Sequence, residues 1–198
     1  CVKCYLQLGK LGDIVSILPC LHACYEETGE KPNLVVASRY ASILEGLDWL
    51  EPVIWPGDWQ DVSGALLSAK QHYGEVIITQ MHAKDYVPRR QYPSFQLDQW
   101  HRCGWLHRWC GLPLDYPRGE RAAEGPTILV GDKGESAPFT KTEELIATLT
   151  KEFPQHRIVR LSDRILPFAK LLALYDAADL IVTVDTLHAH LSMASKTP

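Results

Sequence analysis

The chain has 198 residues and a formal net charge of −4, and 46% of its residues are hydrophobic and 22% charged. These values are ordinary for a globular protein, and the length allows one sizeable core or two small ones. The net negative charge excludes general electrostatic attraction of the whole chain to nucleic acid or anionic lipid. Nucleic acid stays open as a partner, because a local basic patch is enough to bind it. No apolar run approaches the roughly 20 residues that span a bilayer.

Short apolar runs alternate with helical patterns along the first part of the chain. The predicted strands are residues 2–8, 33–37, 53–55 and 75–79. The predicted helices are residues 13–27, 39–45 and a segment that Asp58 caps and that runs to His72. Pro19 lies inside the first of these helices and is expected to kink it or to mark a later start. The alternation indicates βαβ units, and therefore a parallel sheet covered on both faces.

Residues 81–120 interrupt this alternation and hold much of the aromatic content. We expect a loop first, then a helix over 96–110, then a linker over 113–125 that is rich in proline, glycine and charge.

A basic group, Lys84, Arg89 and Arg90, lies in the loop part of this segment. These side chains are suited to a phosphorylated or otherwise anionic acceptor, which makes them candidate acceptor-binding residues. The alternative is a solvated run of charge beside a helix whose tryptophans belong to the core.

The βα alternation then resumes. Strands are predicted at residues 127–130, 157–161 and 180–184, and helices at 141–153, at 166–177 and from about Leu187 onward. The predicted fold class is α/β, with two Rossmann-like parallel-sheet domains at residues 1–120 and 121–198. Because a further strand and helices normally complete the second sheet, we expect this chain to be a fragment or a shortened version of a larger protein.

The chain contains six cysteines. Buried free thiols in a reducing cytoplasm are the favoured interpretation. The alternative is a zinc site formed by Cys103 and Cys110 together with His101 and His107.

The stretch QLGKLGDIVSILP follows the first predicted strand. Gly9 and Gly12 allow a tight turn and the close approach of a ligand, although their spacing is not that of a dinucleotide-binding loop. Asp13 is placed where the carboxyl edge of the sheet is expected, which is the usual location of ligands in open α/β folds. The alternative is that Asp13 is only the N-cap of the following helix.

The stretch DTLHAH follows the last predicted strand. Amides at the start of a helix, with Thr186, are suited to an anion such as a diphosphate, and Asp185 can instead hold sugar hydroxyls. His190 faces the same crevice if the helix starts at Leu187. The alternative is plain helix capping by Asp185 or Thr186, with His188 and His190 as surface or core histidines.

Together, the two stretches resemble the signatures of the heptosyltransferase-like glycosyltransferases (glycosyltransferase family nine). That family has Leu-Gly-Asp and an apolar run to Leu-Pro, and later Asp-Thr/Ser-Gly with a histidine five residues after the aspartate. The matching residues here are Leu11, Gly12, Asp13, Leu18, Pro19, Asp185, Thr186, His190, Leu191 and Pro198. Lys141 stands where the family has a basic residue at the start of a helix.

The resemblance implies a GT-B architecture, in which two Rossmann-like domains face each other across a cleft. It implies a cytoplasmic enzyme that transfers a sugar from a nucleotide sugar to a glycan or other acceptor hydroxyl with inversion. Peripheral association with the inner membrane is compatible with this location. Asp13 would be the general base, and Thr186 and Lys141 would stabilise the departing diphosphate. The nucleotide sugar is a co-substrate, and neither a cofactor nor a metal is implied.

Three departures from the family pattern are visible. Leu187 replaces the family's glycine and can crowd a phosphate, Thr142 and Glu143 stand in place of a Trp-Pro pair, and the usual tail after Pro198 is missing. Two alternatives therefore stay open. One is a nucleotide- or sugar-binding module without catalysis, and the other is a different GT-B enzyme such as a nucleotide-sugar 2-epimerase.

Overall fold

A computed structural model describes residues 3–58, 60–79, 125–134, 139–161, 168–184, 186–192, 195 and 197. The chain divides into two compact units, Cys1–Leu114 and Asp115–Pro198, and each unit contains its own parallel sheet. Several predictions lie outside the described residues: Asp185, the basic group of Lys84, Arg89 and Arg90, the helix at 96–110, the zinc alternative at Cys103 and Cys110, and the domain border at 120.

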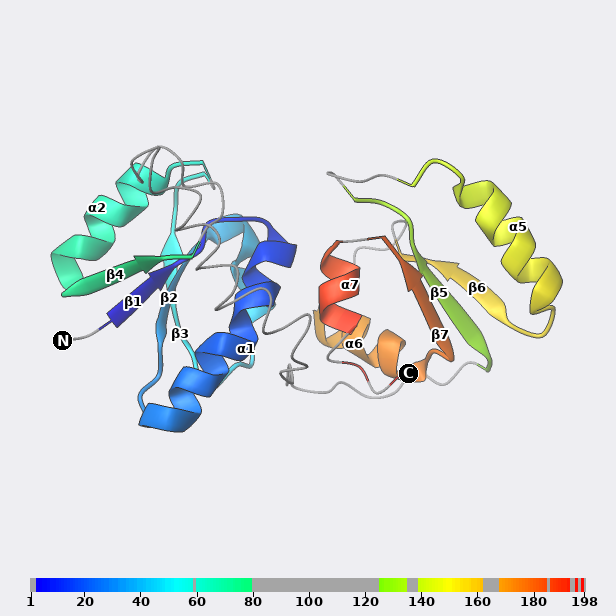
Figure 1. Cartoon of the computed structure of the whole chain (residues 1–198), viewed down its shortest axis with the longest axis horizontal. Helices are drawn as coiled ribbons and strands as arrows, with labels where there is room; N and C mark the ends of the chain where they lie inside the picture. The colour runs from blue at the N-terminus through cyan, green and yellow to red at the C-terminus, as the bar shows by residue number, and fades with distance from the viewer. Residues whose placement is uncertain are drawn as a thin grey trace, which may run out of the picture. The chain divides into compact units, whose positions relative to one another are not determined.

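The first unit contains a four-stranded parallel sheet in the order β3-β2-β1-β4. Its strands are β1 (Lys3–Leu6), β2 (Asn33–Ala37), β3 (Glu51–Trp55) and β4 (Glu75–Ile78). The chain moves outward from β1 to β3 and then returns to the other side of β1. Because such crossovers are right-handed, the reversal of direction places helices α1 and α2 on opposite faces of the sheet, as Figure 1 shows for this unit.

Helix α1 (Leu11–Thr28) buries an apolar stripe formed by Ile14, Val15, Ile17, Leu18 and Leu21. It ends at Gly29, whose left-handed backbone, with φ 70°, is the conformation that glycine adopts most easily. The helix starts two residues before the predicted position, so Gly12 lies in its first turn and not in the preceding loop. Pro19 neither delays nor ends the helix, and its ring is buried with the apolar stripe.

The segment predicted as a short helix at 39–45 is a 3₁₀ helix, η1 (Ser38–Leu44). Helix α2 (Val62–His72) is capped by Asp61, whose Oδ1 accepts a hydrogen bond from the Gly64 N–H at 3.1 Å. The prediction of Asp58 as the cap is wrong. Its Oδ1 accepts from the Gln60 N–H at 3.1 Å instead, within the turn that precedes the helix.

The second unit contains a three-stranded parallel sheet in the order β6-β5-β7. Its strands are β5 (Thr127–Gly131), β6 (Arg157–Arg160) and β7 (Leu180–Thr183), and its helices are α5 (Thr142–Glu152), α6 (Phe168–Ala177) and α7 (Leu187–Ser192). The predicted elements of this part are all present. Because β5 is central, the connections through α5 and α6 run in opposite directions, and these helices lie on opposite faces of this sheet (Figure 1).

The core of the second unit follows from the alternation of side chains along β5. Ile128 and Val130 point to one face, where they pack with Leu149 of α5. Partly buried hydrophobic residues complete this cluster: Leu145, Ile158, Leu180 and Val182. Leu129 points to the opposite face and is fully buried, as is Tyr175 of α6.

Cys4, Cys20 and Cys24 are free thiols. In the part of the chain that the structure describes, no helix combines the length and the apolar character needed to cross a membrane. Within the same residues, no three His, Cys, Asp or Glu side chains lie close enough to hold a metal ion together.

Candidate functional site

The β1–α1 turn stands at the carboxyl edge of the first sheet, and Gln7 ties it to the neighbouring strands. Gln7 is 2% exposed, and its backbone N–H donates to the Val35 carbonyl at 3.0 Å. Its side-chain Nε2 donates to the Thr79 carbonyl at 3.2 Å, and its Oε1 accepts from the Gly9 N–H at 3.0 Å. A buried amide with all these partners holds the turn in one position.

Asp13 lies in the first turn of α1 and is half-buried. Its Oδ2 accepts a hydrogen bond of 3.0 Å from the backbone N–H of Lys10, the residue that precedes the helix. The alternative that Asp13 is the N-cap is therefore wrong, because the carboxylate reaches back to the cap position from within the helix. The hydrogen bond orients this carboxylate, and the N-terminal end of an 18-residue helix stabilises it as an anion.

Gly9 packs directly against this carboxylate. A Cβ atom at Gly9 would lie 2.7 Å from Asp13 Oδ2 and 2.7 Å from Gln7 Oε1, which leaves no room for a side chain. Gly9 is predicted to allow a tight turn and the close approach of a ligand, and its role toward a ligand stays a prediction. In the structure, Asp13 and Gln7 occupy the space where a side chain at Gly9 would lie, so glycine leaves room for the carboxylate.

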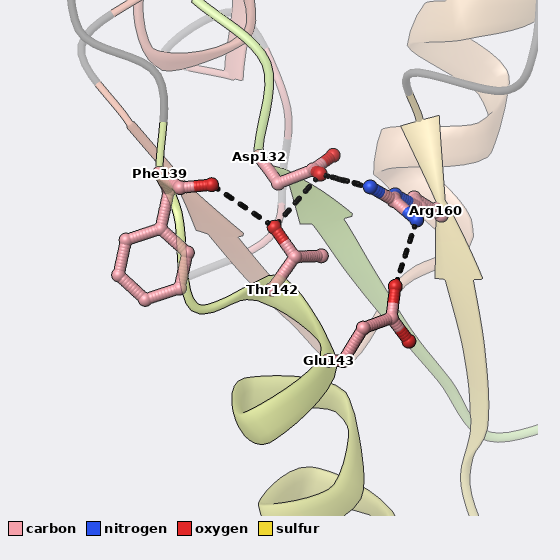
Figure 2. Close-up of polar contacts among 5 residues, drawn as sticks. All are labelled: Asp132, Phe139, Thr142, Glu143 and Arg160. Carbon is pink, nitrogen blue, oxygen red and sulfur yellow. Dashed lines mark hydrogen bonds and ion pairs between the residues drawn. The ribbon is translucent and has the colours of Figure 1, made fainter.

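Sequence reasoning missed a polar cluster at the carboxyl edge of the second sheet, which Figure 2 shows. Asp132 directly follows β5 and is 3% exposed. Its Oδ2 accepts hydrogen bonds from Arg160 Nε at 3.0 Å, from Arg160 Nη2 at 2.6 Å and from Thr142 Oγ1 at 3.0 Å. The Asp132 backbone carbonyl also accepts from the Phe139 N–H at 3.2 Å. One buried carboxylate thus joins the ends of β5 and β6 to the start of α5.

Arg160 pairs with Asp132 and, on the solvent side, also with Glu143. Its Nη1 donates to Glu143 Oε1 at 3.2 Å, and the Glu143 side chain is 83% exposed. The Arg160 side chain is 29% exposed. Because the Asp132 charge is paired at short distance and hydrogen-bonded, its burial does not leave an uncompensated anion in the sheet edge.

Lys141 immediately precedes α5, next to the Thr142 that Asp132 holds. Its Nζ lies 3.3 Å from Glu144 Oε2, and its side chain is 68% exposed. The predicted basic residue is therefore placed at the carboxyl edge of the sheet. Its own contact is an exposed ion pair, which holds it only weakly.

Thr186 caps α7. Its Oγ1 accepts from the His188 N–H at 3.3 Å, and its carbonyl accepts from the Ala189 and His190 N–H groups. His190 is 9% exposed, and Leu187 is half-buried. Thr186 therefore caps the helix, as the capping alternative proposed. The hydrogen bond from the His190 N–H to the Thr186 carbonyl places these two residues one helical turn apart.

A second contact that sequence reasoning missed joins α6 to α7. The Tyr175 hydroxyl and His188 Nδ1 lie 2.6 Å apart. Burial raises the pKa of Tyr175 well above its usual range. Burial also lowers the pKa of His188, and this effect is opposed by the nearby Asp132 charge. Tyr175 lies in an apolar helix and carries no sequence signal, whereas His188 was considered only as a surface or core residue.

The structure brings the predicted residues into local groups. Gly9, Gly12 and Asp13 lie together at the β1–α1 turn of the first unit. In the second unit, Lys141 lies at the start of α5 and Thr186 at the start of α7. The cluster around Asp132 stands at the end of β5, between β6 and β7 in the sheet order.

The whole described chain is similar to solved glycosyltransferase structures. Against the E. coli heptosyltransferase WaaC with ADP, the TM-score is 0.59 at 15% identity, covering 99% of this chain and 85% of WaaC. Against WaaC with ADP-2-deoxy-2-fluoro heptose, it is 0.60 at 15% identity, covering 99% and 86%.

The iron-containing dodecameric glycosyltransferase TibC from enterotoxigenic E. coli gives a TM-score of 0.66 at 11% identity. This match covers 99% of the present chain, which spans 56% of the length of TibC. No protein-family model matches the sequence, and no curated protein matches it.

These similarities are structural, since the identities are low. They confirm the predicted α/β fold class. The chain has the α/β fold with two parallel sheets that is found in GT-B heptosyltransferase structures.

Proposed function

We propose that the protein is a glycosyltransferase that moves a sugar from a nucleotide-sugar donor to an acceptor hydroxyl with inversion. The observation that carries this proposal is the similarity over 99% of the chain to WaaC structures with ADP and with ADP-2-deoxy-2-fluoro heptose. Those bound molecules support a nucleotide sugar as the donor here. The Leu-Gly-Asp motif supports the same conclusion independently, because it places a carboxylate at a sheet edge.

Asp13 is the proposed general base. Its carboxylate takes the proton of the acceptor hydroxyl as the hydroxyl oxygen attacks the anomeric carbon, and the bond from that carbon to the diphosphate breaks. The Lys10 N–H bond to Oδ2 and the close packing of Gly9 support this role, because they hold the carboxylate in one orientation. Gly12 belongs to the same first turn of α1.

Lys141, Thr186 and His190 are the proposed partners of the departing diphosphate, and Asp185 is a proposed partner of sugar hydroxyls. Negative charge grows on the diphosphate as it leaves, and fixed donors stabilise that charge. Lys141 is suited to this role, since its exposed pair with Glu144 is weak and can be exchanged for a phosphate oxygen. We propose that no metal ion takes part.

The acceptor side is assigned to the first unit. We propose that Lys84, Arg89 and Arg90 bind an anionic acceptor, such as a phosphorylated glycan. We also propose a cytoplasmic location, because Cys4, Cys20 and Cys24 are free thiols, as a reducing compartment favours.

A second candidate function is nucleotide or sugar binding without catalysis. The observation that favours it is Leu187, a half-buried side chain in the first turn of α7. The heptosyltransferase-like family, which the sequence resembles, has glycine at this place. A side chain at that place restricts how closely a phosphate can approach the backbone.

The first test is a thermal-shift panel with ADP, GDP, UDP and CDP, followed by transfer assays with sugars of the nucleotide that binds. Asp13→Asn is expected to reduce transfer by about 10²-fold or more while the affinity for the nucleotide is retained. Asp58→Asn is the matched control, because Asp58 is an exposed aspartate of the same unit and its contact is confined to its own turn.

Binding without transfer to any acceptor would favour the binding module. Conversion of the donor sugar to its 2-epimer would identify a different GT-B enzyme. The proposal would be rejected if none of the four nucleotides stabilised the protein, or if Asp13→Asn transferred sugar at the rate of the control.

A further inference from the structure

We infer that His188 is an additional diphosphate-binding residue, whose Nε2–H donates to an oxygen of the bound nucleotide, and that Tyr175 is the residue that positions it. This inference rests on the proposed function, since it assigns a ligand contact to the same unit. Neither residue is among those that match the family pattern, although His188 lies within the DTLHAH stretch.

Tyr175 determines the tautomer of His188. Tyr175 is fully buried, so its hydroxyl hydrogen needs an acceptor within the protein. Among the described residues, His188 Nδ1, at 2.6 Å, is the hydrogen-bond partner of this hydroxyl. Tyr175 is therefore the donor and Nδ1 the acceptor, and a neutral imidazole with an accepting Nδ1 carries its proton on Nε2.

Protonation of the ring would break this arrangement. A second proton would have to sit on Nδ1, and the buried Tyr175 hydroxyl would then lose its acceptor. The lowered pKa of His188, which burial causes, agrees with a ring that is neutral at pH 7. His188 thus presents one fixed N–H donor and no competing tautomer.

The Nε2 edge of the ring lies at the carboxyl end of β5. His188 Cδ2, one of the two carbons bonded to Nε2, would lie 3.2 Å from a Cβ atom placed on Gly131, the last residue of β5. Thr183 Oγ1 would lie 2.7 Å from the same Cβ. The ring therefore packs over a glycine at the sheet edge, in the region where open α/β folds bind ligands.

Nε2 has no hydrogen-bond partner among the described residues, whereas Nδ1 and the backbone N–H of His188 are both used. Within the same residues, the side-chain nitrogens that are fully buried and lack a partner are Trp55 Nε1 and His156 Nδ1. Nε2 of His188 is not among them, so it keeps some contact with solvent. It is thus an oriented donor that is not fully buried. A hydrogen bond from such a donor to a charged oxygen is stronger than one between neutral groups.

The surrounding charges permit an anion here. Asp132 is close enough to act on His188 electrostatically and would by itself repel a diphosphate. Its charge is, however, paired with Arg160 through two hydrogen bonds to the same oxygen. Arg160 is shared with Glu143, whose side chain is 83% exposed and whose charge is therefore screened by solvent. A neutral N–H donor beside a carboxylate paired with arginine is suited to a phosphate oxygen and adds a contact where Leu187 restricts the backbone.

The test uses the nucleotide of the ADP, GDP, UDP and CDP panel that binds the protein most tightly, with its affinity measured by calorimetry. His188→Leu is expected to weaken binding about tenfold or more, the effect of losing one hydrogen bond to a charged group. His188→Gln is expected to stay within about threefold, because its amide N–H can replace Nε2–H. His72→Leu, at an exposed histidine of the first unit, is the control and should bind as the unchanged protein does.

Histidine ring-nitrogen NMR shifts provide a readout that a purely structural role would not give. Nδ1 of His188 is expected to be unprotonated in the unchanged protein, and Tyr175→Phe is expected to yield a mixture of tautomers with weaker nucleotide binding. Equal affinity of His188→Leu and the control, or an Nδ1–H tautomer, would overturn this inference alone. Failure of every nucleotide to bind the unchanged protein would instead overturn the proposed function, and this inference with it.

Discussion

Asp132 and Arg160 form an ion pair at the carboxyl edge of the second sheet, with Arg160 Nη2 2.6 Å from Asp132 Oδ2. The aspartate side chain is 2% exposed and the arginine side chain 29% exposed. The pair links β5 to β6, and through Thr142 it also secures the start of α5, where Lys141 stands. Stability and the proposed donor site therefore depend on the same contact.

Removal of the two partners is expected to have unequal effects. Arg160→Ala leaves a buried carboxylate without its counter-charge and should lower the free energy of unfolding by about 3 kcal/mol. Asp132→Asn should cost less, because the partly exposed arginine can be hydrated and the amide can still accept from Thr142. Urea unfolding, with hydrogen exchange in β5 to locate the effect, measures both. Glu143→Ala, at an 83% exposed partner, is the control and should cost about 1 kcal/mol or less.

Gly9→Ala is expected to displace the Asp13 carboxylate, because the added Cβ would lie 2.7 Å from Oδ2. A displaced base should reduce the sugar-transfer rate by about 10²-fold. Steady-state transfer kinetics, with nucleotide affinity measured separately, test this expectation. Gly29→Asn is the control, since no atom lies within 4 Å of a Cβ there and asparagine tolerates the left-handed backbone at φ 70°. Full activity of Gly9→Ala would contradict the positioning role of Gly9.

Asp61 and Asp58 offer a matched pair for the cap of α2. Asp61→Ala removes the acceptor of the Gly64 N–H and should lower the free energy of unfolding by about 1 kcal/mol. Asp58→Ala removes only the contact with the Gln60 N–H in the preceding turn and should have the smaller effect. Urea unfolding of both variants decides the order. A larger loss for Asp58→Ala would show that the helix starts earlier in solution.

Burial raises the pKa of the Cys4 thiol from 9.0 to about 11, although a hydrogen bond with the Val35 backbone acts in the opposite direction. Between these values the folded protein keeps a proton that the unfolded chain has lost. This contribution to stability is fully present below pH 9.0 and is lost as the pH rises through about 11. A shift of this size corresponds to about 3 kcal/mol at most.

The measurement is the free energy of unfolding across that pH range for the unchanged protein and for Cys4→Ala. The alanine variant should show a shallower fall, because it lacks the thiol that keeps its proton in the folded protein. Parallel curves would mean that the thiol is not shielded from water in the folded state.

Much of the fold could be predicted from local sequence patterns. Apolar periodicity located the strands and helices that the structure describes, because side chains on a strand or helix repeat with a fixed spacing. The predicted start of α1 and the predicted cap of α2 differ by two or three residues from those in the structure. Such boundaries depend on which side chain reaches a free amide, as Asp13 and Asp61 do, and composition alone does not reveal this.

The position of Asp13 at the turn after β1 was likewise visible in the sequence, because a strand, a short loop and a helix follow one another there. The contacts of Asp132 with Arg160 and of Tyr175 with His188 were not. Their partners lie 28 and 13 residues apart. Asp132 meets Arg160 because β5 and β6 are neighbours in the sheet, and Tyr175 meets His188 because α6 and α7 contact each other. The sequence by itself determined which segments form strands and helices, since that preference is local. The tertiary structure alone decided which polar side chains meet at the sheet edges, since strand order and register bring distant residues together.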